Sequence, residues 1–299
     1  MLRTRLLSGF VLAPLIVAII VLGEPWLSLL IGVVAFLALV ELVALLDAAG
    51  YEPPQVLSIV GGMALTGAGL VAANAEGVGG LLTTLLAALD PPGLVGATLV
   101  AAVLLMAAAA FTRSDPRAGF VTWSMSSFGI AYVGLLLPMI VLVAHLAPAG
   151  GSWTTQVGLL GLRSGVAWTL MLVLVVWGYD VGAYLTGRLI GRRRLLDHIS
   201  PSKTVEGLAG GLVLATAAAG IGAALIGLEP WHPLVIGPLV GLSAQAGDLA
   251  ESMLKRAAGR KESGFLVPGH GGILDRVDSF LFAAPVLAGY ALLVAGRVA

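Results

Sequence analysis

The sequence has no cysteine, which excludes disulfides, thiolate metal sites and cysteine nucleophiles. Charged residues are also scarce: they make up 11% of the 299 residues, whereas soluble domains contain about a quarter. So few charges cannot cover the surface of a soluble globular protein. The 16 basic and 16 acidic residues cancel, so the overall charge indicates no nucleic-acid partner.

What the sequence has instead is a hydrophobic content of 59% and a mean hydropathy of +1.02. A helix needs about 20 apolar residues to cross a bilayer, and continuous runs of that length exclude the alternating strands of a membrane barrel. We therefore expect an all-α integral membrane protein with about nine transmembrane helices. The nine stretches are residues 7–23, 26–46, 55–73, 94–111, 125–147, 166–186, 205–228, 233–250 and 279–296.

The distribution of Lys and Arg predicts the orientation of these helices. With a cytoplasmic N-terminus, the cytoplasmic side holds every Lys and Arg except Arg163 and Arg297. Positive residues collect on the cytoplasmic side of membrane proteins. The sequence therefore predicts a multi-pass protein of the inner (cytoplasmic) membrane, with the C-terminus outside and the polar loops facing the cytoplasm.

Charged residues are unevenly spread along the chain, and more than half of them lie in residues 180–278. We expect residues 1–165 to form a transmembrane scaffold of about five helices. Residues 166–299 are expected to form a catalytic transmembrane region with two cytoplasmic loops, residues 187–204 and 251–278.

Carboxylates stand inside predicted membrane helices at Asp180 and Asp248. A charge at this depth costs roughly 2.5–3.5 kcal/mol on insertion scales, so such residues are rare and often functional. A carboxylate that reaches the interface or pairs with an arginine is the structural alternative. Glu41 faces the same choice, and for it a structural role is favoured. Gly178 and Gly182 form a G-x-x-x-G step that predicts close helix packing.

The first cytoplasmic loop combines a possible anion site with a basic run. Ser200 or Ser202 can cap the following helix, and that helix N-terminus with Lys203 beside it suits an anion. The three arginines at 192–194 are more typical of a topology and lipid-headgroup determinant.

The second cytoplasmic loop and its flanking helix ends carry acidic and basic residues in register. On a helix, Asp248, Ser252 and Lys255 share one face, and so do Asp275 and Asp278. Carboxylates bind a hard cation such as Mg²⁺ and leave positions for phosphate oxygens, while Lys and Arg neutralise phosphate charge. This combination indicates phosphoryl or nucleotidyl transfer.

Glycines surround the one histidine of this loop. Gly269, Gly271 and Gly272 flank His270 and allow the backbone to approach a ligand closely. The sequence lacks a Walker A motif, a Rossmann fingerprint and an H-E-x-x-H motif, so nucleotide binding would not use those folds.

Residues 252–278 read S-x-L-K-R-x4-K-E-x-G-x2-V-P-x-H-G-G-I-x-D-R-V-D. This pattern resembles the signature of phosphatidate cytidylyltransferases (CDP-diacylglycerol synthases). It departs from the signature at Glu262, where the family usually has Asp, and at Val267, where it has Leu, Ile or Phe. Residues 180–184 and 200–207 also resemble family segments, and nine spans match the all-helical family fold.

The resemblance implies the reaction CTP + phosphatidic acid → CDP-diacylglycerol + diphosphate, by direct attack of the lipid phosphate on the α-phosphorus. It implies Mg²⁺, alone or with a second cation, held by Asp248 and Asp275 together with Asp180 and Asp278. The implied catalytic residues are Asp248, Asp275, Lys255, Arg256, His270 and Arg276, with the three cations contacting phosphates. Substrate contacts are implied for Ser200, Lys203, Thr204, Ser252, Lys261, Gly271 and Gly272.

The expected partners are CTP, phosphatidic acid and the lipid bilayer, and the sequence leaves a homodimer open. A CTP-dependent lipid or polyprenol kinase, which would release CDP, is the nearest alternative. An ion-coupled transporter with Asp180 and Asp248 as coupling residues is the alternative from a different class. The glycine-rich segment around His270, flanked by cations, argues against a transporter.

Overall fold

The computed structural model describes residues 2–74, 91–148, 150–266 and 271–293, with the backbone alone for residues 2–11. The chain divides into two compact units. The first unit consists of Met1–Ala13, Glu24–Leu142 and Leu254–Val277. The second consists of Pro14–Gly23, Val143–Met253 and Asp278–Ala299. The predicted division into a scaffold and a catalytic region concerns function and stays a prediction.

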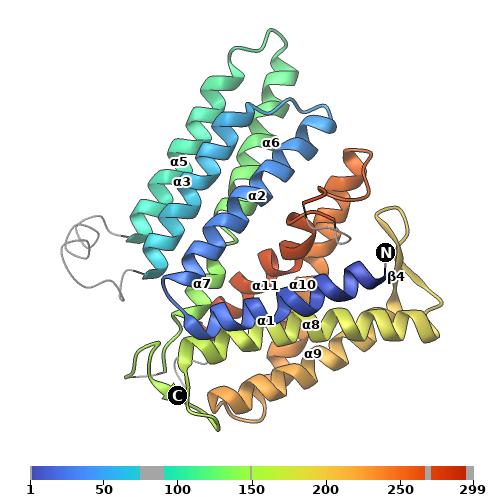
Figure 1. Cartoon of the computed structure of the whole chain (residues 1–299). Coiled ribbons are helices and arrows are strands. Elements are labelled where there is room, and N and C mark those ends of the chain that lie inside the picture. The colour runs from blue at the N-terminus through green and yellow to red at the C-terminus, as the bar shows by residue number, and fades with distance from the viewer. Residues whose placement is uncertain (1, 75–90, 149, 267–270, 294–299) are drawn as a thin grey trace. The chain divides into compact units, whose positions relative to one another are not determined.

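Four helices that pack side by side dominate the first unit (Figure 1). They are α2 (Trp26–Ala48), α3 (Gln55–Asn74), α5 (Pro91–Ala110) and α6 (Pro116–Gly134). Their core contains Leu65, Met106 and Ile130, which are at most 1% exposed. Each helix forms over a long apolar run, as the sequence predicts, and the packed faces exclude lipid and water from this core.

In the second unit, α8 (Ser164–Ile190) and α9 (Val205–Ile226) pack along each other. A Cβ at Gly178 would lie 3.1 Å from the Ala218 methyl group, and one at Gly182 would lie 2.5 Å from the Gly210 carbonyl oxygen. The close packing predicted from the glycine spacing is therefore confirmed. Without side chains at these positions, the two backbones approach each other directly.

Two short antiparallel hairpins flank α8. The strands β1 (Gln156–Val157) and β2 (Leu162–Arg163) precede it, and β3 (Arg194–Leu196) and β4 (Ser200–Thr204) connect it to α9 (Figure 1). Because β4 continues to Thr204, the cap of α9 is Thr204, whose hydroxyl accepts from the Gly207 N–H at 3.0 Å. The prediction that Ser200 or Ser202 caps this helix was wrong.

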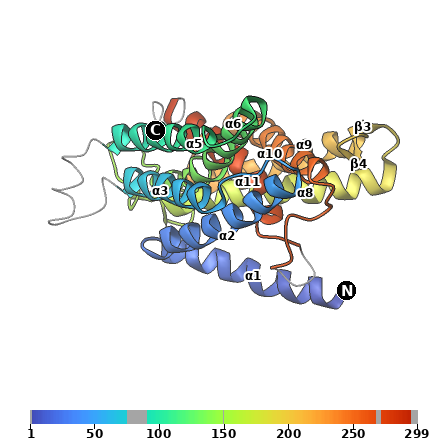
Figure 2. The same cartoon turned by 90° about the horizontal axis from the view of Figure 1, so that it is seen from above.

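The remaining helices are α1 (Leu2–Leu22), α7 (Met139–Ala144), α10 (His232–Ala257) and α11 (Leu274–Leu293) (Figures 1 and 2). Each contributes residues to both units. Within the second unit, a Cβ at Gly247 of α10 would lie 3.1 Å from the backbone carbonyl carbon of Asp278 on α11. These two helices therefore pack closely where Asp248 and Asp278 stand.

Seven candidate membrane spans occur in the part of the chain that the structure describes. They are Trp26–Ala48, Gln55–Asn74, Pro91–Ala110, Pro116–Ala144, Ser164–Ile190, Val205–Ile226 and Leu274–Leu293. Large apolar side chains on their outer faces, such as Leu104 and Val213, are more than 60% exposed, which suits lipid and not water. The chain is thus an all-α, multi-pass membrane protein.

Two of the nine predicted spans are not among these seven. The helix α10 forms where a span is predicted, but Gln245 and Asp248 interrupt its apolar run. In α1, the side chains that the structure describes begin at Leu12, and the apolar stretch Leu12–Leu22 is by itself shorter than a span. The count of nine and the sides of the two termini stay predictions.

Candidate active site

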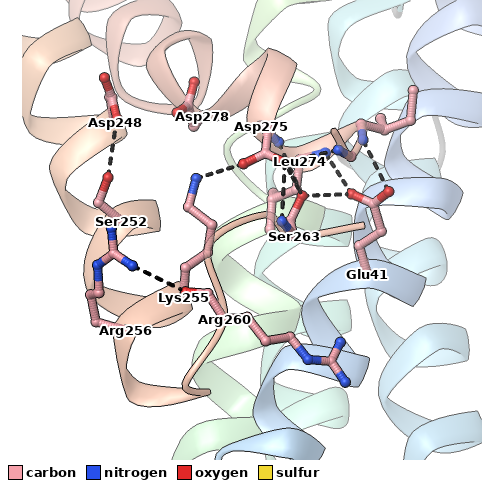
Figure 3. A network of polar contacts seen from close by, with 12 residues as sticks. Glu41, Asp248, Ser252, Lys255, Arg256, Arg260, Ser263, Leu274, Asp275 and Asp278 are labelled. Atoms are coloured by element: carbon pink, nitrogen blue, oxygen red, sulfur yellow. Dashed lines mark hydrogen bonds and ion pairs between the residues drawn. The ribbon is translucent and has the colours of Figure 1, made fainter. Parts of the chain in front are cut away.

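An ion pair between Lys255 and Asp275 connects the two helix ends on either side of the loop that joins α10 to α11 (Figure 3). Lys255 Nζ is 2.5 Å from Asp275 Oδ1, and the two side chains are only 12% and 7% exposed. Lys255 comes from the last turn of α10 and Asp275 from the first turn of α11. A cation at a helix C-terminus and an anion at an N-terminus both interact favourably with the helix dipoles.

The other oxygen of Asp275 holds the loop in place. Asp275 Oδ2 accepts hydrogen bonds from Ser263 N at 3.0 Å, Ser263 Oγ at 2.9 Å and Gly272 N at 2.8 Å. A carboxylate offers about four acceptor positions. The Oδ1 atom, which contacts Lys255, therefore keeps acceptor capacity for a further ligand.

A second carboxylate reaches the same loop from α2. Glu41 is 5% exposed and accepts from Ile273 N at 3.0 Å, Leu274 N at 2.8 Å and Ser263 Oγ at 3.0 Å (Figure 3). Hydrogen bonds to a charged group contribute about 1.5–3 kcal/mol each, so the two backbone bonds and the Ser263 hydroxyl, which is shared with Asp275, offset the cost of burying this carboxylate. These bonds agree with the structural role that the sequence favours for Glu41.

Glycines give the loop its close approach to the two carboxylates. A Cβ at Gly264 or Gly272 would lie 2.7 Å from Glu41 Cδ, and one at Gly271 would lie 2.7 Å from Asp275 Oδ2. Gly271 also has a φ of +83°, a conformation that other residues rarely adopt. In the described loop, the backbone at these glycines therefore contacts the protein's own carboxylates.

Three predicted phosphate or substrate contacts of this loop are exposed. The side chains are those of Arg256, Lys261 and Arg276. The Arg256 guanidinium lies 3.4 Å from the Arg260 carbonyl oxygen (Figure 3). The loop thus presents several accessible cations around a buried ion pair, which suits an anionic ligand with several charges.

The second unit contains its own lysine–aspartate pair. Lys203 Nζ is 2.5 Å from Asp248 Oδ2, with the side chains 18% and 34% exposed. The Ser252 hydroxyl donates to Asp248 Oδ1 at 3.3 Å. Asp248 and Ser252 therefore share a face of α10, as their spacing predicts.

About one turn before Asp248 on α10, Gln245 Oε1 accepts a hydrogen bond from the Tyr179 hydroxyl of α8 at 2.7 Å. Both side chains are buried. Asp180 and Asp248 lie within electrostatic range of the Tyr179 hydroxyl. Since Gly247 packs against Asp278, carboxylates from α8, α10 and α11 all belong to this part of the second unit.

The hairpin β3–β4 is fixed by the start of α9. Glu206 accepts from the backbone N–H groups of Arg192 and Arg193, at 3.0 and 3.1 Å. Ser200 is buried, whereas the side chains of residues 192–194 are exposed. The hairpin therefore holds its basic residues toward solvent beside Lys203.

Comparison with known proteins identifies the family of the chain. Residues 3–294 match the model of the cytidylyltransferase family. The chain belongs to this family. The resemblance noted from the sequence pattern is confirmed.

Several curated relatives of this cytidylyltransferase family member carry the name phosphatidate cytidylyltransferase. The protein from Synechocystis sp. is 43% identical over 133 residues, which cover 44% of this chain and 45% of that protein. The protein from Bacillus subtilis (strain 168) is 46% identical over 125 residues, 41% of this chain and 46% of that protein. The chain therefore spans about half the length of the curated relatives it matches.

The donor set of the second unit fits a hard cation. Mg²⁺ in proteins is typically held by one or two carboxylates, with substrate phosphates and water in its other positions. Asp248, Asp278 and Ser252 offer carboxylate and hydroxyl oxygens, and Lys203 already places a positive charge against Asp248. Within the described ranges, no three His, Cys, Asp or Glu residues lie together as a metal site of their own, so phosphate oxygens and water would have to complete the coordination.

The predicted site residues are distributed over both units. The first unit holds Lys255, Arg256, Lys261, Gly271, Gly272, Asp275 and Arg276. The second holds Asp180, Ser200, Lys203, Thr204, Asp248, Ser252 and Asp278. His270 and Val267 lie outside the described residues. The roles assigned to all of these residues stay predictions.

Sequence reasoning missed three members of these networks: Ser263, Tyr179 and Gln245. Ser263 stands at a variable position of the signature pattern and gave no signal. Gln245 did give one, because it is a polar residue within the predicted span 233–250. Buried polar residues of membrane helices usually have a partner, and here that partner is Tyr179.

Proposed function

We propose that this protein is a phosphatidate cytidylyltransferase that converts CTP and phosphatidic acid to CDP-diacylglycerol and diphosphate. The observation that carries the proposal is the buried Lys255–Asp275 pair within the loop that contains the signature pattern. Membership of the cytidylyltransferase family and the names of the curated relatives support it.

The reaction requires positioning and charge neutralisation more than covalent chemistry. An oxygen of the lipid phosphate forms a bond to the α-phosphorus of CTP, and the bond from that phosphorus to the bridging oxygen of diphosphate breaks. Lys255, Arg256 and Arg276 are proposed to contact the CTP phosphates and to neutralise the charge that develops on the leaving diphosphate. Lys261 and the backbone at Gly271 and Gly272 are proposed to hold the nucleotide.

The lipid phosphate is proposed to bind on the side of Lys203. The Lys203 side chain is only 18% exposed and its ammonium group already contacts a carboxylate, so it is held in one place before the substrate arrives. Ser200, Thr204 and Ser252 supply hydroxyl groups from the adjacent β4 strand and α10. Ordered cations and hydroxyls lower the entropy that the two substrates lose on alignment.

Magnesium is proposed to be held by Asp248 and Asp275, with Asp180 and Asp278 as further carboxylates. When bound, Mg²⁺ supplies neutralisation of phosphate charge and a template for substrate oxygens. The chain's own part is to present these oxygens on three helices. His270 is proposed to belong to the site as well, because glycines flank it on both sides.

The active site is proposed to face the cytoplasm from the inner membrane. The excess of Lys and Arg in both polar loops supports this side. A lipid substrate then reaches the site from the bilayer, while CTP and diphosphate exchange with the cytosol.

The test is an assay of the purified full chain with CTP, phosphatidic acid in mixed micelles and Mg²⁺. We expect CDP-diacylglycerol and diphosphate in equal amounts, and near-complete loss of both in Asp275→Asn. Asp47→Asn is the matched control, because Asp47 is an exposed aspartate of the same unit. Absence of CDP-lipid from the wild-type protein would refute the function.

A further inference from the structure

We propose that Glu41 is a positioning residue: it orients Asp275 and thereby the ammonium group of Lys255. The inference rests on the proposed function, since Lys255 is there a phosphate contact. It adds to the site a residue of α2, far from the signature pattern in sequence. Glu41 acts through Ser263 and the first turn of α11 and does not contact substrate.

Glu41 binds the start of α11. Glu41 Oε1 accepts from Ile273 N and Oε2 accepts from Leu274 N. Leu274 is the first residue of the helix and Asp275 the second. The first N–H groups of a helix have no partner within the helix. A carboxylate that binds two of them therefore determines where the helix begins and in which direction Asp275 leaves it.

The Ser263 hydroxyl lies between two carboxylates. Its oxygen is 3.0 Å from Glu41 Oε2 and 2.9 Å from Asp275 Oδ2 (Figure 3). A hydroxyl has one proton, so it can donate to only one of the two carboxylates at a time. The charges on Glu41 and Asp275 thus share a single donor, and a change at one carboxylate alters the hydrogen bonding of the other.

The two carboxylate oxygens of Asp275 have different partners: Oδ1 contacts Lys255, and Oδ2 accepts from the loop. All three donors to Oδ2 come from Ser263 and Gly272. Both of these residues pack against Glu41, since the Ser263 hydroxyl donates to it and a Cβ at Gly272 would lie 2.7 Å from its carboxyl carbon. Glu41 therefore fixes the Oδ2 side of Asp275 and turns Oδ1 toward Lys255.

The contacts also say why Glu41 is not itself a ligand-binding group. Backbone atoms of the loop approach its carboxylate at Gly264 and Gly272, where no Cβ would fit. The side chain is 5% exposed. Each of its oxygens is directed at loop donors, so its effect on the reaction has to pass through the loop.

The test compares Glu41→Gln with Glu52→Gln in the full chain. The Gln side chain has the same shape, but its amide nitrogen would face N–H or O–H donors. Glu52 is a matched control, because it is an exposed carboxylate of the same unit that pairs with Arg113. We expect Glu41→Gln to lower kcat by roughly 10- to 100-fold with little change in the KM for CTP. Glu52→Gln should behave as wild type.

A double variant separates positioning from loss of folding. Ser263→Ala should lower kcat as well, and Glu41→Gln combined with Ser263→Ala should be much less impaired than the product of the two single effects, because both act on the same contact. Independent, multiplicative effects would overturn the proposal. So would a Glu41→Gln protein whose folded fraction falls while kcat per folded molecule is unchanged.

Hydrogen exchange supplies a readout that does not need activity. The amides of Ile273 and Leu274 should exchange faster in Glu41→Gln than in Glu52→Gln, and unchanged exchange would overturn the inference. If the wild-type protein forms no CDP-lipid, the proposed function fails. Faster exchange in that case would still support the control of α11 by Glu41, so the two failures are distinguishable.

Discussion

The ammonium group of Lys255 and the carboxylate of Asp275 are in contact at 2.5 Å, although 20 residues of sequence separate them. The loop between them folds back so that the end of α10 meets the start of α11. Because both side chains are largely buried, the charge on each one is stabilised by the opposite charge on the other. The pair gives the signature loop a fixed arrangement and presents one lysine to an anionic ligand.

Substitution Lys255→Met is expected to reduce kcat/KM by about 100-fold, because the transition state loses a phosphate contact. It also leaves Asp275 buried without its cation, which typically costs about 3–5 kcal/mol of stability. The measurement is steady-state cytidylyl transfer together with thermal unfolding in detergent. Arg260→Met is the control, since the Arg260 side chain is exposed. Wild-type kinetics in Lys255→Met would contradict the assigned role.

Substitution Gly182→Ala is expected to destabilise the second unit by about 1–3 kcal/mol, because the added methyl group would overpack the contact between α8 and α9. Its Cβ would lie 2.5 Å from the Gly210 carbonyl oxygen. Gly220→Ala on α9 is the matched control, because nothing lies within 4 Å of a Cβ there. Thermal unfolding of both variants checks this. Equal unfolding midpoints would contradict the prediction, because they would show that the contact between α8 and α9 tolerates the added methyl group.

Removal of divalent cations by a chelator is expected to abolish cytidylyl transfer, and added Mg²⁺ should restore it. The physical reason is that Asp248, Asp275 and the further proposed carboxylates add negative charge to that of CTP and the lipid phosphate, and a divalent cation offsets it. Lys203 must then share Asp248 with the metal. Full activity in the presence of excess chelator would argue against any role for a metal.

Single cysteines test the orientation, and the absence of natural cysteines makes the experiment direct. Arg260→Cys should be protected from a membrane-impermeant thiol reagent in intact cells. Leu159→Cys is the matched position, because Leu159 is 84% exposed and lies in a segment predicted to be outside. Labelling of position 260 but not of position 159 would reverse the predicted topology.

The long helices and the positions of the polar residues within them could be predicted because both are local properties. Apolar runs determine helices such as α2 and α8, and the G-x-x-x-G step at Gly178 predicts the close packing of α8 against a neighbouring helix. The charges at Asp180 and Asp248 stand out against an apolar background. Such signals require only neighbouring residues.

The rest depends on contacts between distant segments. Glu41 and Ser263 are 222 residues apart, and no spacing rule connects them. The cap of α9 was misplaced because Ser200 and Ser202 lie in strand β4, which continues to Thr204, the residue before the helix begins. Both serines are good caps in isolation, but the hairpin places a different residue at the helix start.

Cytidylyl transfer is tested most directly by following the α- and the γ-phosphate of CTP separately. The purified protein is supplied with phosphatidic acid, Mg²⁺ and CTP labelled in either the α- or the γ-phosphate. The account predicts that the α label appears in the lipid product and the γ label in diphosphate. Transfer of the γ label to lipid with release of CDP would identify a lipid kinase and contradict the account, as would the absence of any labelled lipid.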